Sequence, residues 1–261
     1  MHIYFQIVKQ EVFTLFISTT TYISSFYFLC LLGVSYRFFL EFFSSTNWIL
    51  PPLTSLLIGL LFGSPGLVPF LTMRTFSEER KLGTLEVLMS APVSPTELVL
   101  GKWTASLLFL YAIFGLSFCY PFITYLTFPA TGLSLGYKEH SQWIGILSFI
   151  ALHGCTFSAL GIFASTLTKN QMISGMLTFS LISIYLTAII FTFGQSFPIS
   201  ENQGVVDYLE STVLSLCSGL SQIHTFSLGL IDLKTILHQL TLTILFLFLA
   251  IVQVDRIKHK T

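Results

Sequence analysis

The chain has 261 residues, of which 53% are hydrophobic and only 9% are charged, and its mean hydropathy is +0.81. Soluble domains have about 25% charged residues, so this composition predicts a polytopic membrane protein and excludes an ordinary soluble domain. The formal net charge is zero, so no basic surface for nucleic acid is expected. The four cysteines form no CxxC pair, which supports neither a disulfide framework nor a metal site.

Charge-free runs that exceed the roughly 20 residues of a membrane helix divide the chain into spans. We predict an all-α fold in a single transmembrane domain, residues 1–261. Its six spans cover about 15–36, 49–72, 103–128, 142–167, 171–194 and 235–254. A short interfacial helix is expected before the first span.

A seventh charge-free run, 211–231, is rich in Ser, Thr, Gln and His. With six crossings and both termini in the cytoplasm, nine Lys and Arg residues lie inside and three outside. This distribution satisfies the positive-inside rule, which a seventh crossing would spoil. We therefore place 195–234 outside the membrane as an amphipathic helical segment before the sixth span. The alternative for this segment is a loose loop.

Two spans carry unusual residues. The second contains Gly59 and Gly63, which let another helix approach closely, either within this chain or across a dimer. Its prolines predict that its lower half is kinked or broken and that it faces the protein interior. The fourth contains His153, which we expect to be neutral and hydrogen-bonded to a neighbouring helix. A proton relay is disfavoured because no Asp or Glu lies in any span.

The hydrophilic run Arg74–Lys102 carries eight of the chain's 24 Lys, Arg, Asp and Glu residues in 29 positions. One such Asp, Lys or Arg at a bilayer centre costs about 2.5–3.5 kcal/mol, so this run cannot cross lipid. We therefore predict a cytoplasmic loop, residues 74–102, between the second and third spans.

Local signals divide this loop into two helices. Thr75 and Glu78 have the spacing of a capping box that begins the first helix. An apolar stripe follows at helical offsets, made of Leu82, Leu85, Leu88 and Met89. Pro92 ends this helix near residue 91, and 94–97 forms a second capping box. Gly83 weakens the first helix, which predicts a kink or a close approach by a partner backbone.

The sequence does not match known catalytic or nucleotide-binding motifs at the spacing that they require. Gly101 and Lys102 resemble the end of a phosphate loop, but Thr96 stands where its first Gly is required and Trp103 replaces the magnesium-binding Ser or Thr. The pair Glu78–Glu79 lacks the following Arg of an intramembrane protease. Neither GxSxG nor HExxH is present. We expect no cofactor in this chain, and a membrane hydrolase is the disfavoured alternative.

The run FLTMRTFSEERKLGTLEVLMSAPVSPTELVLGK resembles the signature of ABC-2 type permeases, the membrane subunits of ATP-driven exporters. The closest resemblance is to the branch associated with gliding motility and copper-enzyme maturation. The matching positions are Pro69, Thr72, Met73, Arg74, Glu78, Glu79, Arg80, Gly83, Thr84, Glu86, Pro92, Gly101 and Lys102. A second patch covers 223–226 and 229–232, and a weaker one covers 8–11. Leu228 departs from the pattern, because a basic residue is expected there.

The resemblance implies half of a transporter in a bacterial cytoplasmic membrane. Two six-helix subunits, identical or not, would enclose a pathway above two separate ATPase subunits that bind ATP and Mg²⁺. The loop between spans two and three would be the coupling helix that docks on the ATPase.

The resemblance also implies roles within this loop. Leu85, Leu88 and Met89 would fill a groove on the ATPase, Gly83 would allow close contact, and four charged residues would form ion pairs at the rim. These four are Glu78, Glu79, Arg80 and Glu86. The remaining members of the predicted coupling set are Arg74, Thr84, Pro92, Gly101 and Lys102. ATP-driven movement would tilt the second span through its Pro and Gly breaks.

An alternative function keeps the architecture but moves no cargo. The ATPase would then power a force-transmitting or assembly complex in the membrane. The spans offer only Ser, Thr and occasional Gln as polar lining. Such a lining suits lipid-like or amphipathic cargo better than ions.

Overall fold

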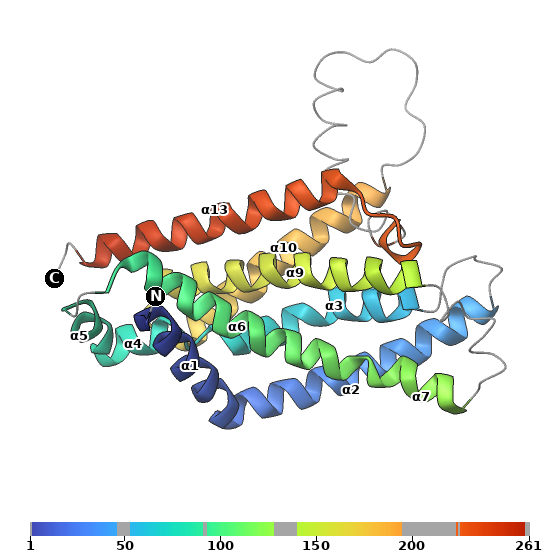
Figure 1. Ribbon diagram of the computed structural model, residues 1–261, viewed down its shortest axis with the longest axis horizontal. Helices are drawn as coiled ribbons and strands as arrows, with labels where there is room; N and C mark the ends of the chain where they lie inside the picture. Colours follow the sequence, from blue (N-terminus) through green and yellow to red (C-terminus); the bar gives the residue numbers. More distant parts are fainter. Residues whose placement is uncertain are drawn as a thin grey trace, which may run out of the picture.

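The structure, a computed structural model, describes residues 2–45, 53–90, 93–127, 140–194, 223 and 225–258. All regular elements in these ranges are helices (Figure 1). They are α1 His2–Ile17, α2 Thr19–Ser45, α3 Leu53–Thr72, α4 Ser77–Leu82, α5 Thr84–Ser90, α6 Pro95–Ser117, α7 Cys119–Thr127, α9 His140–Leu167, α10 Gln171–Gly194 and α13 Leu233–Lys258. Of the amphipathic segment predicted for 195–234, residues 195–222 and 224 lie outside the described residues.

Four helical stretches in the described residues are long and apolar enough to cross a membrane, and they contain α3, α6 with α7, α9 and α13. The bent pair of α1 and α2 provides a fifth, and α10 contributes a shorter apolar stretch, Gln171–Thr187. The all-α polytopic fold is therefore as predicted. The count of six crossings stays a prediction.

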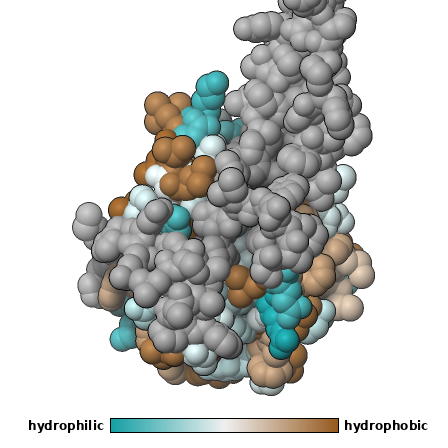
Figure 2. All heavy atoms as spheres, turned by 90° about the vertical axis from the view of Figure 1, so that its right-hand side faces the viewer, coloured by the Kyte–Doolittle hydropathy of each residue, from teal (hydrophilic) through white to brown (hydrophobic). Residues whose placement is uncertain are grey.

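The six long rods α2, α3, α6, α9, α10 and α13 run along the long axis of the molecule (Figure 1). The first helix, the helices α4 and α5, and the last turn of α13 all lie at one end. This arrangement agrees with an even number of crossings. Figure 2 shows the opposite end, where hydrophobic and hydrophilic residues are intermixed on the described surface.

The N-terminal helix is a separate element, as predicted. The chain turns by 70° between α1 and α2 at Ser18. α1 packs along α6 so closely that a Cβ on Gly101 would lie 2.9 Å from the Cγ2 atom of Ile7. On its outer side Phe5 and Phe13 are exposed. An exposed apolar face beside a helix bend is consistent with the predicted position at the membrane surface.

α3 is an interior helix of the bundle, as predicted, and its Leu56, Leu57 and Leu67 side chains are fully buried. Of the predicted alternatives for its lower half, a kink or a break, the break is absent, because α3 continues through its two prolines to Thr72. Pro65 has no N–H to donate to the carbonyl of Leu61. The hydroxyl of Ser64 donates to that carbonyl instead, at 2.7 Å, and so keeps the helix intact.

The small residues of α3 face α2 of the same chain. A Cβ on Gly59 would lie 2.6 Å from Ser35 Oγ, and a Cβ on Gly63 would lie 2.7 Å from the ring of Phe28. The sequence leaves open whether these glycines pack against a helix of this chain or across a dimer. The structure shows packing within the chain. Larger side chains at either position would push α2 away from α3.

A hydrogen-bonded network joins α9, α10 and α13 inside the bundle. His153 accepts on Nε2 from Gln239 Nε2, at 3.2 Å, while its Nδ1 donates to the Phe149 carbonyl. The amide of Gln239 also donates to Tyr185 Oη, at 2.7 Å, and accepts from Thr156 Oγ1, at 2.6 Å. With the amide oriented this way the imidazole is neutral, because both ring nitrogens of a charged histidine donate. The predicted hydrogen bond of His153 to a neighbouring helix is confirmed.

α9 lies at the centre of the fold, in contact with α3, α6, α10 and α13. It packs tightly against α3 at Gly161, where an added Cβ would lie 2.3 Å from Thr72 Oγ1 and 2.8 Å from Thr72 Cβ. The backbones of α3 and α9 can approach so closely only because this position has no side chain.

Gly161→Ala is therefore expected to lower the free energy of unfolding by about 1–3 kcal/mol, the usual cost of overpacking. Thermal unfolding of the purified protein in detergent measures this change. Gly115→Ala in α6 is the matched control, since no atom lies within 4 Å of its added Cβ. Equal melting temperatures for the two variants would contradict the packing role of Gly161.

Candidate functional site

The predicted cytoplasmic loop forms a helical corner, which we define as α4, Gly83 and α5 (residues 77–90). Gly83 ends α4 with φ of +72°, the left-handed conformation that side chains with a Cβ disfavour. Of the two predicted roles of Gly83, the structure has the kink, which divides the predicted helix into two short helices. The second ends at Ser90, next to the predicted end at residue 91.

The two predicted capping boxes have opposite outcomes. The box at Ser94 is confirmed: its hydroxyl accepts from the Glu97 backbone N–H, and its own N–H donates to the Glu97 carboxylate. The box at Thr75 and Glu78 is wrong, because α4 begins after Phe76 without a side-chain cap of its own. α9 supplies the cap, since Ser165 Oγ accepts from the N–H groups of Phe76, at 3.0 Å, and Ser77, at 3.2 Å.

The apolar stripe of the corner faces inward. Leu85 is only 1% exposed, in an apolar cluster with residues of α6, α9 and α13 such as Val99, Ile162 and Val254. Leu88 and Met89 are half-buried against the same cluster. The prediction that Leu85 fills a groove on another protein is therefore wrong. An apolar stripe on a helix indicates that this face is buried, but it does not show which protein buries it. Here the face is buried by other helices of the same chain.

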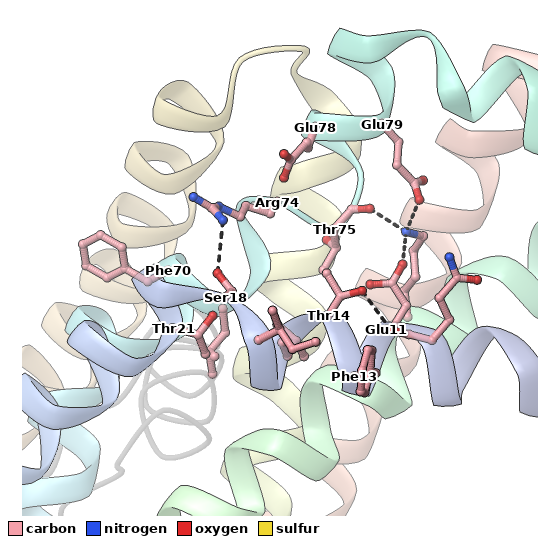
Figure 3. A pocket seen from close by; sticks show the side chains of 15 residues that line it. Glu11, Phe13, Thr14, Ser18, Thr21, Phe70, Arg74, Thr75, Glu78 and Glu79 are labelled. Carbon is pink, nitrogen blue, oxygen red and sulfur yellow. Dashed lines mark hydrogen bonds and ion pairs between the residues drawn. The ribbon is translucent and has the colours of Figure 1, made fainter.

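Lys102 is the buried charge of this region, with 2% of its surface exposed. Its ammonium donates to Glu11 Oε1, to Glu79 Oε1 at 2.7 Å, and to the carbonyl of Thr75 at 2.7 Å (Figure 3). These three acceptors satisfy all three N–H bonds of the ammonium. We call Glu11, Glu79 and Lys102 the ion cluster. It ties α1, α4 and α6 together.

The ion cluster corrects the predicted role of Glu79. Its carboxylate binds Lys102 inside the chain and is not free to form a rim ion pair with another protein. Lys102, also a member of the predicted coupling set, is buried in the same cluster. Burial raises the pKa of the Glu79 carboxyl, while the ammonium of Lys102 opposes this rise. Gly101 provides the close contact between α6 and α1, with no part in the outer surface.

Two other charged residues of the predicted coupling set, Arg74 and Arg80, form hydrogen bonds within the chain. Arg80 donates to the carbonyl of Thr166, and Arg74 donates from Nη1 to Ser18 Oγ at 3.1 Å. Both bonds are internal. The outer face of the corner presents Lys81, Leu82, which is 67% exposed, and Thr84.

Two further members of the predicted coupling set cannot be placed. The Glu86 side chain and Pro92 lie outside the described residues. In the described part of the chain, no group of three His, Cys, Asp or Glu residues is arranged to hold a metal.

Sequence reasoning missed the two residues that anchor the corner from other helices. Glu11 is 91 positions from Lys102, and Ser165 is 88 positions from Ser77. The available signal for Glu11 was chemical: a lysine at the end of an apolar span needs a carboxylate partner, and few lie near a span end in this chain. A serine hydroxyl gives no comparable signal, because most of them bond within their own helix.

Together these features define a polytopic all-helical membrane protein with an anchored helical corner beside its termini. The family model described as ABC-2 family transporter protein matches residues 3–254, so the chain belongs to this family. It is a membrane component of an ABC transporter. A search of curated proteins found no match.

The ion cluster generates a prediction about stability. Lys102→Met is expected to lower the free energy of unfolding by about 3–5 kcal/mol, because two carboxylates then lose their buried partner. Thermal unfolding in detergent measures the loss. Replacing Glu11 and Glu79 by Gln in the same chain should recover part of it, because no uncompensated charge remains.

Arg37→Met is the control for this change. Arg37 pairs with Glu41 at the surface, at 3.0 Å, and such an exposed pair contributes at most about 1 kcal/mol. An equal effect of Lys102→Met and Arg37→Met would show that the ion cluster does not stabilise the fold.

Proposed function

We propose that the chain is the permease subunit of an ABC-2 exporter and that ATP hydrolysis on a separate ATPase subunit drives it. Membership of the family supports the transporter assignment. Gly101 and Lys102 lie within the helix α6, and Lys102 is bound by carboxylates, so they do not form a phosphate loop. ATP and Mg²⁺ would therefore bind to the partner.

The single observation that carries the coupling proposal is that the corner is anchored on its inner side and exposed on its outer side. Its inner side is fixed to α1, α6, α9 and α13, while its outer side presents Lys81, Leu82 and Thr84. An exposed leucine between polar groups at a helix end is a surface that a partner can bury. This outer side replaces the Leu85 side as the proposed contact, with Glu86 and Pro92 retained.

The anchors of the corner supply a route for movement. A displacement of α4 would act on α1 and α6 through the ion cluster, and on α9 through Ser165. α9 in turn contacts α3, α10 and α13. We propose that the ATPase moves these helices as a packed unit. Because α3 is continuous, it would tilt as one rod and not bend at its prolines.

The finer assignments follow the resemblance of the run 69–102. They are two ATPase copies, a second permease subunit, and the gliding-motility and copper-enzyme-maturation branch. The proposed location is a bacterial cytoplasmic membrane with both termini in the cytoplasm. The common end shared by α1, the corner and the end of α13 supports this orientation (Figure 1).

One purification tests the proposed function. The tagged full-length chain, isolated from its native membrane in mild detergent, is expected to bring with it a polypeptide that an azido-ATP probe labels. ATP hydrolysis should belong to that polypeptide and not to the tagged chain. Absence of any labelled polypeptide, or labelling of the tagged chain itself, would overturn the proposal.

The outer face gives a sharper test. Leu82→Asp is expected to weaken binding of the co-purified ATPase about tenfold or more, because one buried leucine contributes about 1.5–3 kcal/mol. Titration of the labelled ATPase against the variant in detergent measures the change. The melting temperature should not fall, since Leu82 makes few contacts within the chain.

The matched control is Leu230→Asp, a similarly exposed leucine just before α13, which begins at the end of the bundle opposite the corner (Figure 1). It should leave binding of the ATPase unchanged. Unchanged binding in Leu82→Asp would place the contact elsewhere. Transport itself is separable from force transmission: movement of labelled lipid or peptide between vesicle leaflets on addition of ATP would favour the exporter.

A further inference from the structure

A cavity of about 520 Å³ lies where the corner meets the N-terminal helix (Figure 3). α1, the first turn of α2, the end of α3, α4 and Lys102 of α6 surround it. Its volume falls in the range of about 300–1,000 Å³ that is usual for sites of small molecules or cofactors. Neither the packing of the bundle nor the proposed contact with an ATPase uses this space.

Two buried polar atoms at the cavity have no hydrogen-bond partner among the described residues: Arg74 Nε and Glu79 Oε2. Each of these side chains already has one partner, since Arg74 Nη1 donates to Ser18 Oγ and Glu79 Oε1 accepts from Lys102. A buried polar atom without a partner costs about 1–3 kcal/mol. One donor and one acceptor left unpaired at the same cavity indicate a ligand that supplies both partners.

The charges of the lining specify the ligand further. Lys102 is paired with two carboxylates, which leaves Arg74 as the remaining cation and Glu78 as an additional anion of the lining. In the described structure no ion pair joins Arg74 to Glu78 or Glu79. Opposite charges that do not neutralise each other complement a ligand that carries both an anion and a cation.

The hydrogen-bond donors and acceptors of the lining indicate which anion and which cation the ligand carries. A guanidinium binds phosphate through N–H groups in a planar fork, and the Ser18 hydroxyl lies beside it. A carboxylate accepts hydrogen bonds only, so the cation must carry N–H groups. A primary ammonium meets this condition and a quaternary one does not.

The rim of the cavity is apolar. Phe13 is 65% exposed, Ile17 63% and Phe70 46%. Figure 3 shows Phe70 on the side of Arg74 and Phe13 on the side of Glu11. These residues belong to the end of α1 and the end of α3, at the predicted membrane surface. Exposed aromatic and aliphatic side chains around a charged cavity suit an amphipathic ligand.

We propose that this cavity binds a phospholipid with a phosphoethanolamine headgroup. The phosphate binds Arg74 and Ser18, the ammonium lies at Glu78 and Glu79, and the acyl chains run along Phe13, Ile17 and Phe70. The site is independent of the proposed ATPase contact, because its lining is on the inner side of the corner. A soluble phosphoethanolamine ester has the same polar chemistry, and the experiment separates the two sources.

The full-length protein is purified in detergent and stripped of lipid, and its melting temperature is measured with added lipid. Dioleoyl phosphatidylethanolamine should raise the melting temperature by at least about 3 °C, because a ligand that binds only the folded state stabilises it. Dioleoyl phosphatidylcholine and phosphatidylglycerol should raise it by less than half as much. Equal shifts with the three lipids would overturn the proposal.

Glycerophosphoethanolamine is the soluble arm of the same experiment. A full shift with this compound alone would overturn the role of the acyl chains, whereas no shift at millimolar concentration supports a lipid. Native mass spectrometry should retain one phosphatidylethanolamine per chain in preference to the other two lipids. Neither the melting temperature nor the mass spectrum requires an ATPase. A negative result for lipid binding can therefore be distinguished from a failure of the proposed function.

Variants locate the site. Arg74→Gln should abolish the shift produced by phosphatidylethanolamine, measured from the variant's own baseline. Glu78 forms no hydrogen bond or ion pair from its side chain to another described residue. Glu78→Gln should lower the preference for phosphatidylethanolamine over phosphatidylglycerol about tenfold, because the remaining guanidinium favours a net anion.

Arg37→Gln and Glu41→Gln, on the surface of α2, are the controls and should keep the full shift. Should Arg74→Gln fail to fold, Glu78→Gln decides alone. An unchanged lipid preference in Glu78→Gln would overturn the site.

Discussion

The ammonium of Lys102 has to be neutralised inside the protein, and this requirement organises the end of the bundle that carries the corner. An isolated buried ammonium would cost several kcal/mol, so the fold must bring acceptors to it. They come from α1, from α4 and from the turn before α4. α1 is thereby held along α6, and α4 is held across the end of the bundle. The outer face of the corner is consequently a defined surface.

Much of the fold could be predicted because its signals are local. The cap at Ser94 needs only a hydroxyl and a carboxylate three residues apart, and the break at Gly83 needs only a residue that tolerates positive φ. The neutral state of His153 followed from the lack of acidic residues in the spans. Composition was sufficient for the all-helical membrane fold.

What could not be predicted depends on contacts between distant parts of the chain. The same local rule that succeeded at Ser94 failed at Thr75, because Ser165 reaches the first N–H groups of α4. The inward orientation of Leu85 depends on α6, α9 and α13. The helix α3 survives its prolines because Ser64 replaces a lost donor. In the first two cases the residues that decide the structure are far away in the sequence. In the third, the sequence does not show which carbonyl the Ser64 hydroxyl binds.

The order in which the chain is made gives the ion cluster a further consequence. Glu11 leaves the ribosome 91 residues before Lys102. Until α6 has been synthesised, Glu11 and Glu79 have no ammonium to bind, and α1 has no helix to lie along. The ion cluster can therefore form only after Lys102 has been synthesised, and a chain that ends before this residue leaves both carboxylates without their cation.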